Sequence, residues 1–343
     1  MTTQLDAQIG YKKETTFGTP VTVDTFVEFI AEDLDYNVEW AQGAGMRVGQ
    51  RLDYSDRRVK VKEDASGSFT VELQTKGLGK LIEAALGGTG TSTQIAASAA
   101  YQQLFTPTTT DYLSSYTIQK GIPPLGGGST NPMTFDGMVC SGFELTGNNG
   151  IPTLKFNWIG RSLATGTSLA TASYASGVKE LAFVHGSVTI GGTVTVPTTT
   201  ALGSSDATTS ANVPDFNLTY NNGLDPNGFN YGGAGKRVRK PALGKRKVEG
   251  SLTVEYDSNT LRDAWLAGTD LGLVMTFTDA SVAIAGSNYP TFQITIPVIK
   301  LNGELPKVNG GDVVRQTVPF EGSDGRSATH PFYVAIVTAE TAI

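Results

Sequence analysis

A seven-residue pattern that occurs twice constrains the fold of this chain more than any other feature. Residues 67–73 read GSFTVEL, and residues 250–256 read GSLTVEY. In both copies apolar and polar side chains alternate, which places the apolar residues on one face of an extended strand and Thr and Glu on the other. Each copy is therefore predicted to be a β-strand with one buried face.

The sequence after each of these strands predicts a short amphipathic helix. In the first copy, apolar residues recur at helical spacing over 78–86, and the glycines at 87–88 end the pattern. In the second copy, the capping residues at 257–259 precede a stripe of apolar residues, and Gly268 follows it. The order of strand and helix is therefore the same in both copies.

Each copy then continues with one more strand and closes with a strand pair. The additional strands are expected at 115–119 and 273–277. The closing pairs are expected at 139–146 with 153–160, and at 291–301 with 313–322. Asn-Gly pairs between the paired strands are typical of hairpin turns.

The repeated order of elements indicates a tandem duplication. The first module is predicted to span residues 1–162, a Ser/Thr/Ala-rich linker 163–176, and the second module 177–343. A second polar stretch, 197–213, has no apolar periodicity and is expected to be flexible. With 41 glycines and many Thr, Val and aromatic residues, the fold class is mainly β.

The composition argues against several kinds of function. A formal net charge of −6 disfavours tight nucleic-acid binding. The single cysteine, Cys140, excludes an internal disulfide framework and lies in an apolar stretch, so we expect it to be buried. The two histidines, His185 and His330, have no catalytic surroundings in sequence. We therefore expect neither an enzyme nor a bound cofactor or metal ion.

The sequence also lacks targeting features. No secretion signal and no apolar run long enough to span a bilayer is visible, so we expect a soluble protein made in a cytoplasm, with no membrane partner.

Long polar stretches precede both repeated strands, at 41–66 and 221–249, and both are expected to be irregular and basic. Their basic residues are Arg47, Arg51, Arg57, Arg58, Lys60 and Lys62 in the first, and Lys236, Arg237, Arg239, Lys240, Lys245, Arg246 and Lys247 in the second. Long loops in corresponding places suggest a shared use. Residues 236–247 contain no aromatic side chain for base stacking, so contact with an acidic surface of a neighbouring subunit is favoured over contact with nucleic acid.

The N-terminal segment carries a resemblance to a known family. Residues 8–20 read QIGYKKETTFGTP, which physically is an extended arm, and FVEFI follows at 26–30 as a strand. This pattern resembles the N-terminus of tail tube (major tail) proteins of long-tailed bacteriophages. Together with the succession of long loop, GSFTVE strand, short helix and hairpin, the resemblance covers nearly the whole chain.

The resemblance implies an architecture and a function. Tail tube proteins are β-sandwiches with a flanking helix, and six copies form a ring whose inner strands close a shared β-barrel. Rings stack into a hollow tube through which DNA leaves the capsid. Two modules in one chain imply a trimeric ring with pseudo-sixfold symmetry, and barrel closure removes strand edges that would otherwise aggregate.

The same resemblance implies the partners. The chain would bind itself, and the tape measure, tail terminator and distal tail proteins, in a virion assembled in the host cytoplasm, while double-stranded DNA passes without specific binding. Glu72 and Glu255 are equivalent in the two copies and are candidates for lumen-facing residues; an outer solvent-facing position is the alternative. The basic stretches, the N-terminal arm and 197–213 would contact neighbouring rings or lie on the outer surface.

Two other functions remain open from the sequence. One is a different β-sandwich part of the virion, namely a tail terminator, baseplate or head decoration protein. The other is a carbohydrate-binding, adhesin-like module, for which aromatic residues in a row on one face would be the sign. Trp40, Trp158 and Trp265 lie in unlike sequence contexts.

Overall fold

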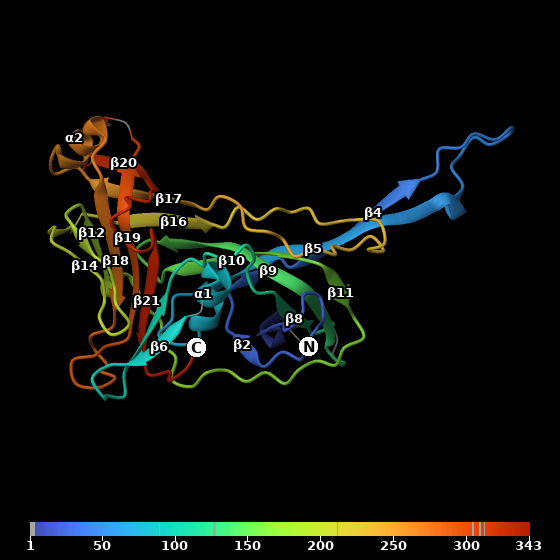
Figure 1. The fold of residues 1–343 in the computed structure, drawn as a ribbon, viewed down its shortest axis with the longest axis horizontal. Coiled ribbons are helices and arrows are strands. Elements are labelled where there is room, and N and C mark those ends of the chain that lie inside the picture. The colour runs from blue at the N-terminus through green and yellow to red at the C-terminus, as the bar shows by residue number, and fades with distance from the viewer. Residues whose placement is uncertain are drawn as a thin grey trace.

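The computed structural model describes residues 4–88, 90–125, 128–210, 212–303, 305–308, 310–311 and 313–343. Over these residues the chain is mainly β, with short helices, which confirms the predicted fold class at this level. Figure 1 shows β5, β9 and β10 running along the length of the molecule, with β18, β19 and β21 crossing that direction at one end.

The elements of the N-terminal half are η1 (Gln4–Asp6), β1 (Gln8–Lys13), β2 (Thr25–Val27), β3 (Ala31–Glu32), β4 (Asp35–Gln42), η2 (Ser55–Arg57), β5 (Arg58–Glu72), α1 (Gly79–Leu86), β6 (Thr91–Gln94), β7 (Tyr101–Phe105), β8 (Tyr116–Ile122), β9 (Asn131–Gly147), β10 (Thr153–Gly160) and β11 (Ser162–Ala164). Those of the C-terminal half are η3 (Phe183–His185), β12 (Gly186–Ile190), β13 (Val194–Thr195), β14 (Ser204–Ser205), β15 (Thr209–Ser210), β16 (Asp215–Asn221), β17 (Lys247–Glu255), α2 (Thr260–Ala267), β18 (Leu271–Thr278), β19 (Thr291–Leu301), β20 (Arg315–Gly322) and β21 (Tyr333–Thr338).

Six strands in each half pair in the same order, and every pairing is antiparallel. In the N-terminal half the order is β1, β8, β9, β10, β5, β4, which we term the first strand set. In the C-terminal half it is β12, β18, β19, β20, β17, β16, the second strand set. The predicted repeated strands 67–73 and 250–256 fall in β5 and β17.

The register of the two sets also corresponds. Gly67 lies opposite Trp158 in the first set, and Gly250 lies opposite Phe320 in the second. β8 and β18 each have one register shift close to their first residue. Residues at equivalent places in the two strand sets therefore have equivalent partners on the neighbouring strands.

Both predicted helices are present and end where glycine permits it. Gly87 and Gly268 have φ of 71° and 63°, the left-handed conformation that stops a helix. Six of the eight residues of α1 are buried, whereas α2 carries Leu266 with 65% of its surface exposed. The two helices therefore differ in how much chain covers them.

The two strand sets are joined into one sheet through β16. On one edge β16 pairs with β17, and on the other it pairs with the C-terminal part of β9, from Phe216 opposite Gly147 to Asn221 opposite Gly142. We term this β9–β16 pairing the internal seam. Directly opposite each other in it lie Leu218 and Leu145, both fully buried.

The internal seam is also the centre of the apolar core. The rings of Phe143 and Tyr220 stack across it with 5.7 Å between centroids, and Phe332 packs on Tyr220 at 5.0 Å. Burying side chains of this size stabilises a fold by about 1.5–3 kcal/mol each. A second connection, the pairing of β21 with β7 as well as β19, reinforces the joint.

The prediction that the stretch 41–66 is irregular is wrong at both ends of the stretch, which are β-strand. β4 and β5 form a long hairpin that includes residues up to Gln42 and from Arg58 onward. The sequence RVKVK at 58–62 alternates, but with long cations rather than apolar residues, so its strand character was missed. Cross-strand attraction holds it, since Lys62 Nζ lies 3.1 Å from Glu39 Oε1.

Two further expectations need correction. Residues 8–13 are not a free arm but strand β1, paired with β2 and β8, and Ile9 and Tyr11 are fully buried. In the stretch 197–213, expected to be flexible, buried Gln102 donates hydrogen bonds to the carbonyls of Thr198 and Ala201, at 2.8 and 3.0 Å. Buried amides require such partners, and the segment is held by them.

Shortening Leu218 to alanine is expected to destabilise the chain by about 2–5 kcal/mol, because the internal seam cannot collapse around the missing atoms. The matched control is Thr219→Ala on the opposite face of β16, which should change stability by no more than about 0.5 kcal/mol. Urea unfolding of both variants measures the difference. Equal stabilities would show that the seam does not hold the two strand sets together.

Candidate assembly interface

One face of the joined sheet is polar over most of its extent; past Asn157 of β10 it becomes apolar, where Ile159 lies opposite buried Val139 in a small cluster that includes Leu224 of the β16–β17 connection. Residues that lie opposite one another across β5, β10, β9, β16, β17 and β20 share this face. They are Thr70, Glu72, Thr153, Lys155, Asn157, Glu144, Thr146, Asp215, Asn217, Thr219, Asn221, Lys247, Glu249, Ser251, Thr253, Glu255, Arg315, Thr317, Pro319 and Glu321. We term this surface the polar face; none of these residues is buried.

Glu72 and Glu255 both lie on the polar face, one in each strand set. Residues directly opposite one another on successive strands connect Glu72 of β5 to Asn217 of β16 and then to Ser251 of β17. Glu255 lies four residues after Ser251 in β17. Arg315 Nη2 approaches Glu255 Oε1 at 3.4 Å. In total the face carries six acidic and three basic side chains, so it is negatively charged.

The second basic stretch lies against the first strand set. Residues 222–246, which we term arm 2, connect β16 to β17, and Figure 1 shows this chain running along β5. Its Arg237 is only 2% exposed. The Arg237 guanidinium donates hydrogen bonds to the carbonyls of Pro226, at 2.8 Å, and Gly160.

Arg237 is held by charge and by stacking as well. Its Nη2 lies 3.4 Å from Asp64 Oδ2, and its guanidinium lies over the ring of Phe229 at 4.7 Å. Burial lowers the pKa of the Arg237 guanidinium, while Asp64 and Asp225 oppose that shift. Arginine stays charged even so, and its planar fork suits several acceptors at once.

A second acidic residue of β5, Glu63, fixes the next part of arm 2. Lys236 Nζ lies 3.4 Å from Glu63 Oε1, and the Glu63 amide donates to the Gly235 carbonyl at 2.9 Å. Burial alone would raise the pKa of Glu63, but hydrogen bonds from Lys60, Tyr36 and Lys236 lower it. Glu63 and Asp64 were not among the predicted site residues, although this acidic pair directly follows the basic run of β5.

The other basic residues of arm 2 and of the start of β17 are less enclosed. Arg239 is paired with Asp225 at the surface, and Lys247 Nζ lies 2.5 Å from Glu249 Oε2. Lys245 is exposed, Lys240 has a pKa lowered by burial, and Arg246 Nε donates to Asn222 Oδ1 at 3.4 Å. An inter-subunit role for Arg237 does not fit its burial within its own chain.

The first basic stretch projects from the body instead. Residues 43–57, which we term arm 1, connect β4 to β5, and Figure 1 shows this loop extending beyond β4. Met46 and Val48 at its tip are fully exposed. Fully exposed apolar side chains on a projecting loop are typical of a surface that another molecule covers.

The basic residues of arm 1 and Arg58, the first residue of β5, fall into two groups. Arg57 Nη1 donates to the Gly45 carbonyl at 2.7 Å, and the Arg58 guanidinium lies over the ring of Trp40 at 5.3 Å. These two side chains shape the base of the arm. Arg47 and Arg51 lie at its exposed end.

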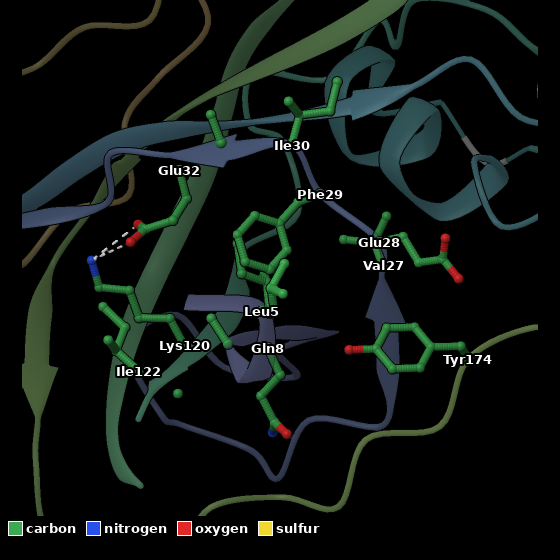
Figure 2. Close-up of a pocket in the computed structure, with 14 residues that line it drawn as sticks. Leu5, Gln8, Val27, Glu28, Phe29, Ile30, Glu32, Lys120, Ile122 and Tyr174 are labelled. Carbon is green, nitrogen blue, oxygen red and sulfur yellow. Dashed lines mark hydrogen bonds and ion pairs between the residues drawn. The ribbon is translucent and has the colours of Figure 1, made fainter. Parts of the chain in front are cut away.

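A hollow of about 610 Å³ lies between β1, β2, β3 and β8. Figure 2 shows Lys120 and Glu32 pointing toward each other at one side of it, and Lys120 Nζ lies 3.0 Å from both carboxylate oxygens. Apolar side chains such as Val27 and Phe29 make up much of the rest. Lys120 and Glu32 satisfy each other, and Glu28, the other charged residue of the lining, is exposed.

No metal-binding arrangement is present among the residues that the structure describes. They contain no group of three or more His, Cys, Asp and Glu placed to hold a metal ion. Cys140 is buried as predicted, and burial raises the pKa of its thiol to about 12, which makes it unreactive. Within the same ranges, no helix has the length and apolar character needed to cross a membrane.

Replacing Arg237 by methionine is expected to release arm 2 from the first strand set and to destabilise the chain by about 3–5 kcal/mol, because Asp64 and several carbonyls lose their buried partner. Cleavage by chymotrypsin at Phe229 and Tyr231 should become faster. Arg239→Met, which removes an exposed pair on the same arm, is the control and should leave the cleavage rate unchanged. Equal cleavage of both variants would mean that Arg237 does not anchor the arm.

Comparison with known proteins identifies the family. Residues 4–322 match the family model described as phage tail tube protein. No curated protein matched the chain. Members of this family are structural components of the virion tail rather than enzymes. Because the match covers most of the sequence, the chain belongs to the phage tail tube protein family.

Proposed function

We propose that this chain assembles into stacked rings that form the hollow tail tube of a long-tailed phage, a passive conduit for DNA. The single observation that carries the proposal is the joined sheet, in which both strand sets present one continuous polar face. An open antiparallel sheet of this kind, apolar on one face and polar on the other, is suited to line an aqueous channel.

The two strand sets represent tandem tube modules, 1–162 and 177–343, joined by 163–176. The repeated pairing order and the matching positions of Gly67 and Gly250 support this duplication. A tube ring of six modules then requires three chains, so the ring is a trimer with pseudo-sixfold symmetry. The internal seam, in this view, is a module–module contact that has become part of one chain.

The polar face lines the lumen, with Glu72 and Glu255 in equivalent positions. Its excess of acidic side chains supports this assignment, because a surface that repels phosphates lets DNA slide without binding. The outward-facing alternative for these residues would leave the negative face in contact with solvent outside the tube.

The arms make the contacts between subunits and rings. Arm 1 supports this with its exposed Met46 and Val48 and the cations Arg47 and Arg51. The basic residues of arm 2 and the start of β17 other than Arg237 contribute where they reach the surface. Tape measure, tail terminator and distal tail proteins are the further partners, at the ends and in the lumen of the tube.

The carbohydrate-binding alternative has no support in the positions of the tryptophans. Trp158 is 2% exposed in the core, Trp265 packs against the core, and Trp40 stacks with Arg58. They form no exposed aromatic row.

Electron microscopy of the purified chain at high concentration tests the proposal. We expect tubes of uniform width with a regular axial repeat, and native mass measurement of rings released from them should give three chains per ring. A protein that stays monomeric under all assembly conditions would contradict the tube, and six chains per ring would contradict the duplication.

Reversing the charge at the end of arm 1, with Arg47→Glu and Arg51→Glu together, is expected to abolish or strongly reduce tube formation. The physical reason is that the arm would meet an acidic neighbour with like charge. Tube length and yield, measured by electron microscopy and sedimentation at several salt concentrations, report the effect. The control, Lys76→Glu with Lys179→Glu, makes the same charge change away from the arms and should leave assembly intact. Normal, salt-independent tubes from the arm 1 variant would exclude an electrostatic role for the arm.

A further inference from the structure

The strand β4 has an edge without a partner among the described strands. It pairs with β5 on one side only. Its counterpart in the second set, β16, pairs with β17 on one side and with β9 on the other. A long unpaired edge invites another strand, and proteins normally cover or block such edges. The contrast between β4 and β16 therefore marks β4 as an edge that lacks its neighbour.

The counterpart of β9 lacks a neighbour at the matching place. β9 continues past its pairing with β8, and residues Gly142 to Gly147 pair with β16. β19 is the counterpart of β9, and the chain after it continues beside β20, where the Asn302 amide donates to the Pro319 carbonyl at 2.8 Å. Pro319 occupies the position that Asn157 has in β10, and Asn157 lies opposite Gly142. Asn302 therefore corresponds to Gly142.

The exposure of Leu305 is consistent with a missing partner strand. The dipeptide Glu-Leu occurs at 144–145 in β9 and again at 304–305 after β19. Leu145 is fully buried against β16, whereas Leu305 is 56% exposed. Leu305 is apolar, like Leu145 in the internal seam, but no described strand covers it.

The two arms show the same contrast. Arm 2 lies along the first strand set, where Asp64 and Glu63 receive its cations. Arm 1 leaves the sheet at the corresponding place, between β4 and β5, and meets no strand set of its own chain. A second strand set placed beside β4 would give arm 1 a surface, and Glu321 on the polar face of that set carries the complementary charge, while Glu249 is paired with Lys247.

We infer that the internal seam is repeated between copies: the free edge of β4 in one copy pairs, antiparallel, with the chain that follows β19 in a second copy. The register is that of the internal seam, in which Phe216–Asn221 pair with β9; the matching residues are 32–37, and those of them in β4 are Asp35–Asn37. Tyr36 and Tyr220 hold matching positions opposite Ala65 and Val248, so Asn37 is the counterpart of Asn221. Because Asn221 lies opposite Gly142, Asn37 of one copy lies opposite Asn302 of the next.

This contact joins two different edges, so it is heterologous and closes into a ring when its rotation permits. The eight strands β4, β5, β10, β9, β16, β17, β20 and β19 run in this order across one copy. The two edges of the contact are the first and last strands of that run. The inference rests on the proposed ring and adds which edges meet and in what register.

Two variants with one introduced cysteine each, Asn37→Cys and Asn302→Cys, test the register. Both side chains are exposed, and the native Cys140 is buried. Residues directly opposite in an antiparallel pair have Cα atoms about 4.5–5.5 Å apart, which suits a disulfide. We expect a disulfide-linked pair of chains when the two variants are mixed, assembled and oxidised, and none when either is assembled alone.

The matched control replaces Asn37→Cys with Asp35→Cys. Asp35 is exposed on the same face of β4, but two residues away, roughly 6–7 Å along the strand. We expect the yield of linked chains with Asn302→Cys to fall to background. Equal or better linking by Asp35→Cys in well-formed tubes would overturn the register.

Amide hydrogen exchange of the unmodified chain tests the inference without depending on the folding of any variant. Amides of β4 that face the free edge should exchange slowly with deuterium in assembled tubes and quickly in the monomer. Tubes with unchanged β4 exchange would overturn the inferred seam and leave the tube function standing. Absence of tubes from the unmodified chain would overturn the proposed function itself.

Discussion

Backbone pairing between β9 and β16 holds the two halves of the chain in one sheet, and most of the architecture depends on it. Without this pairing, each strand set would expose an edge and part of an apolar face. With it, Leu145 and Leu218 meet, Phe143 stacks on Tyr220, and the opposite face remains polar from β5 to β20. The separation of an apolar and a polar face follows from the two-residue period of a strand once the register is set.

The two arms have different surroundings because the internal seam places a neighbouring strand set beside arm 2 but not beside arm 1. Arm 2 extends over the first strand set because the seam brings that set alongside, and Arg237 is buried with Asp64 and several carbonyls. Arm 1 starts from the other end of the sheet, where no second set is present in the chain. Its exposed Met46 and Val48 are therefore a consequence of the same geometry that buries Arg237. Two stretches of similar composition have different surroundings because only one has a neighbouring set.

Much of the local structure was predictable from sequence. Alternation in 67–73 and 250–256, the glycines after both helices, and the hairpin turns each act over a few residues, so local patterns are sufficient. The failures have a common cause. RVKVK at 58–62 forms strand with cations in place of apolar residues, and residues 8–13 pair along their whole length with β8, which lies far away in sequence. The basic run containing Arg237 gave no sign that one cation would be buried while Arg239 stays at the surface.

The sequence by itself determined that the chain carries one pattern of elements twice and that it is mainly β. These properties depend on residue type and on spacing over short distances. Only the tertiary structure decided that the two strand sets share a sheet through β9 and β16, that Glu72 and Glu255 lie on one face, and that Glu63 and Asp64 receive arm 2. Pairing between strands some seventy residues apart depends on which edges remain free after each set has folded, and no local pattern records that.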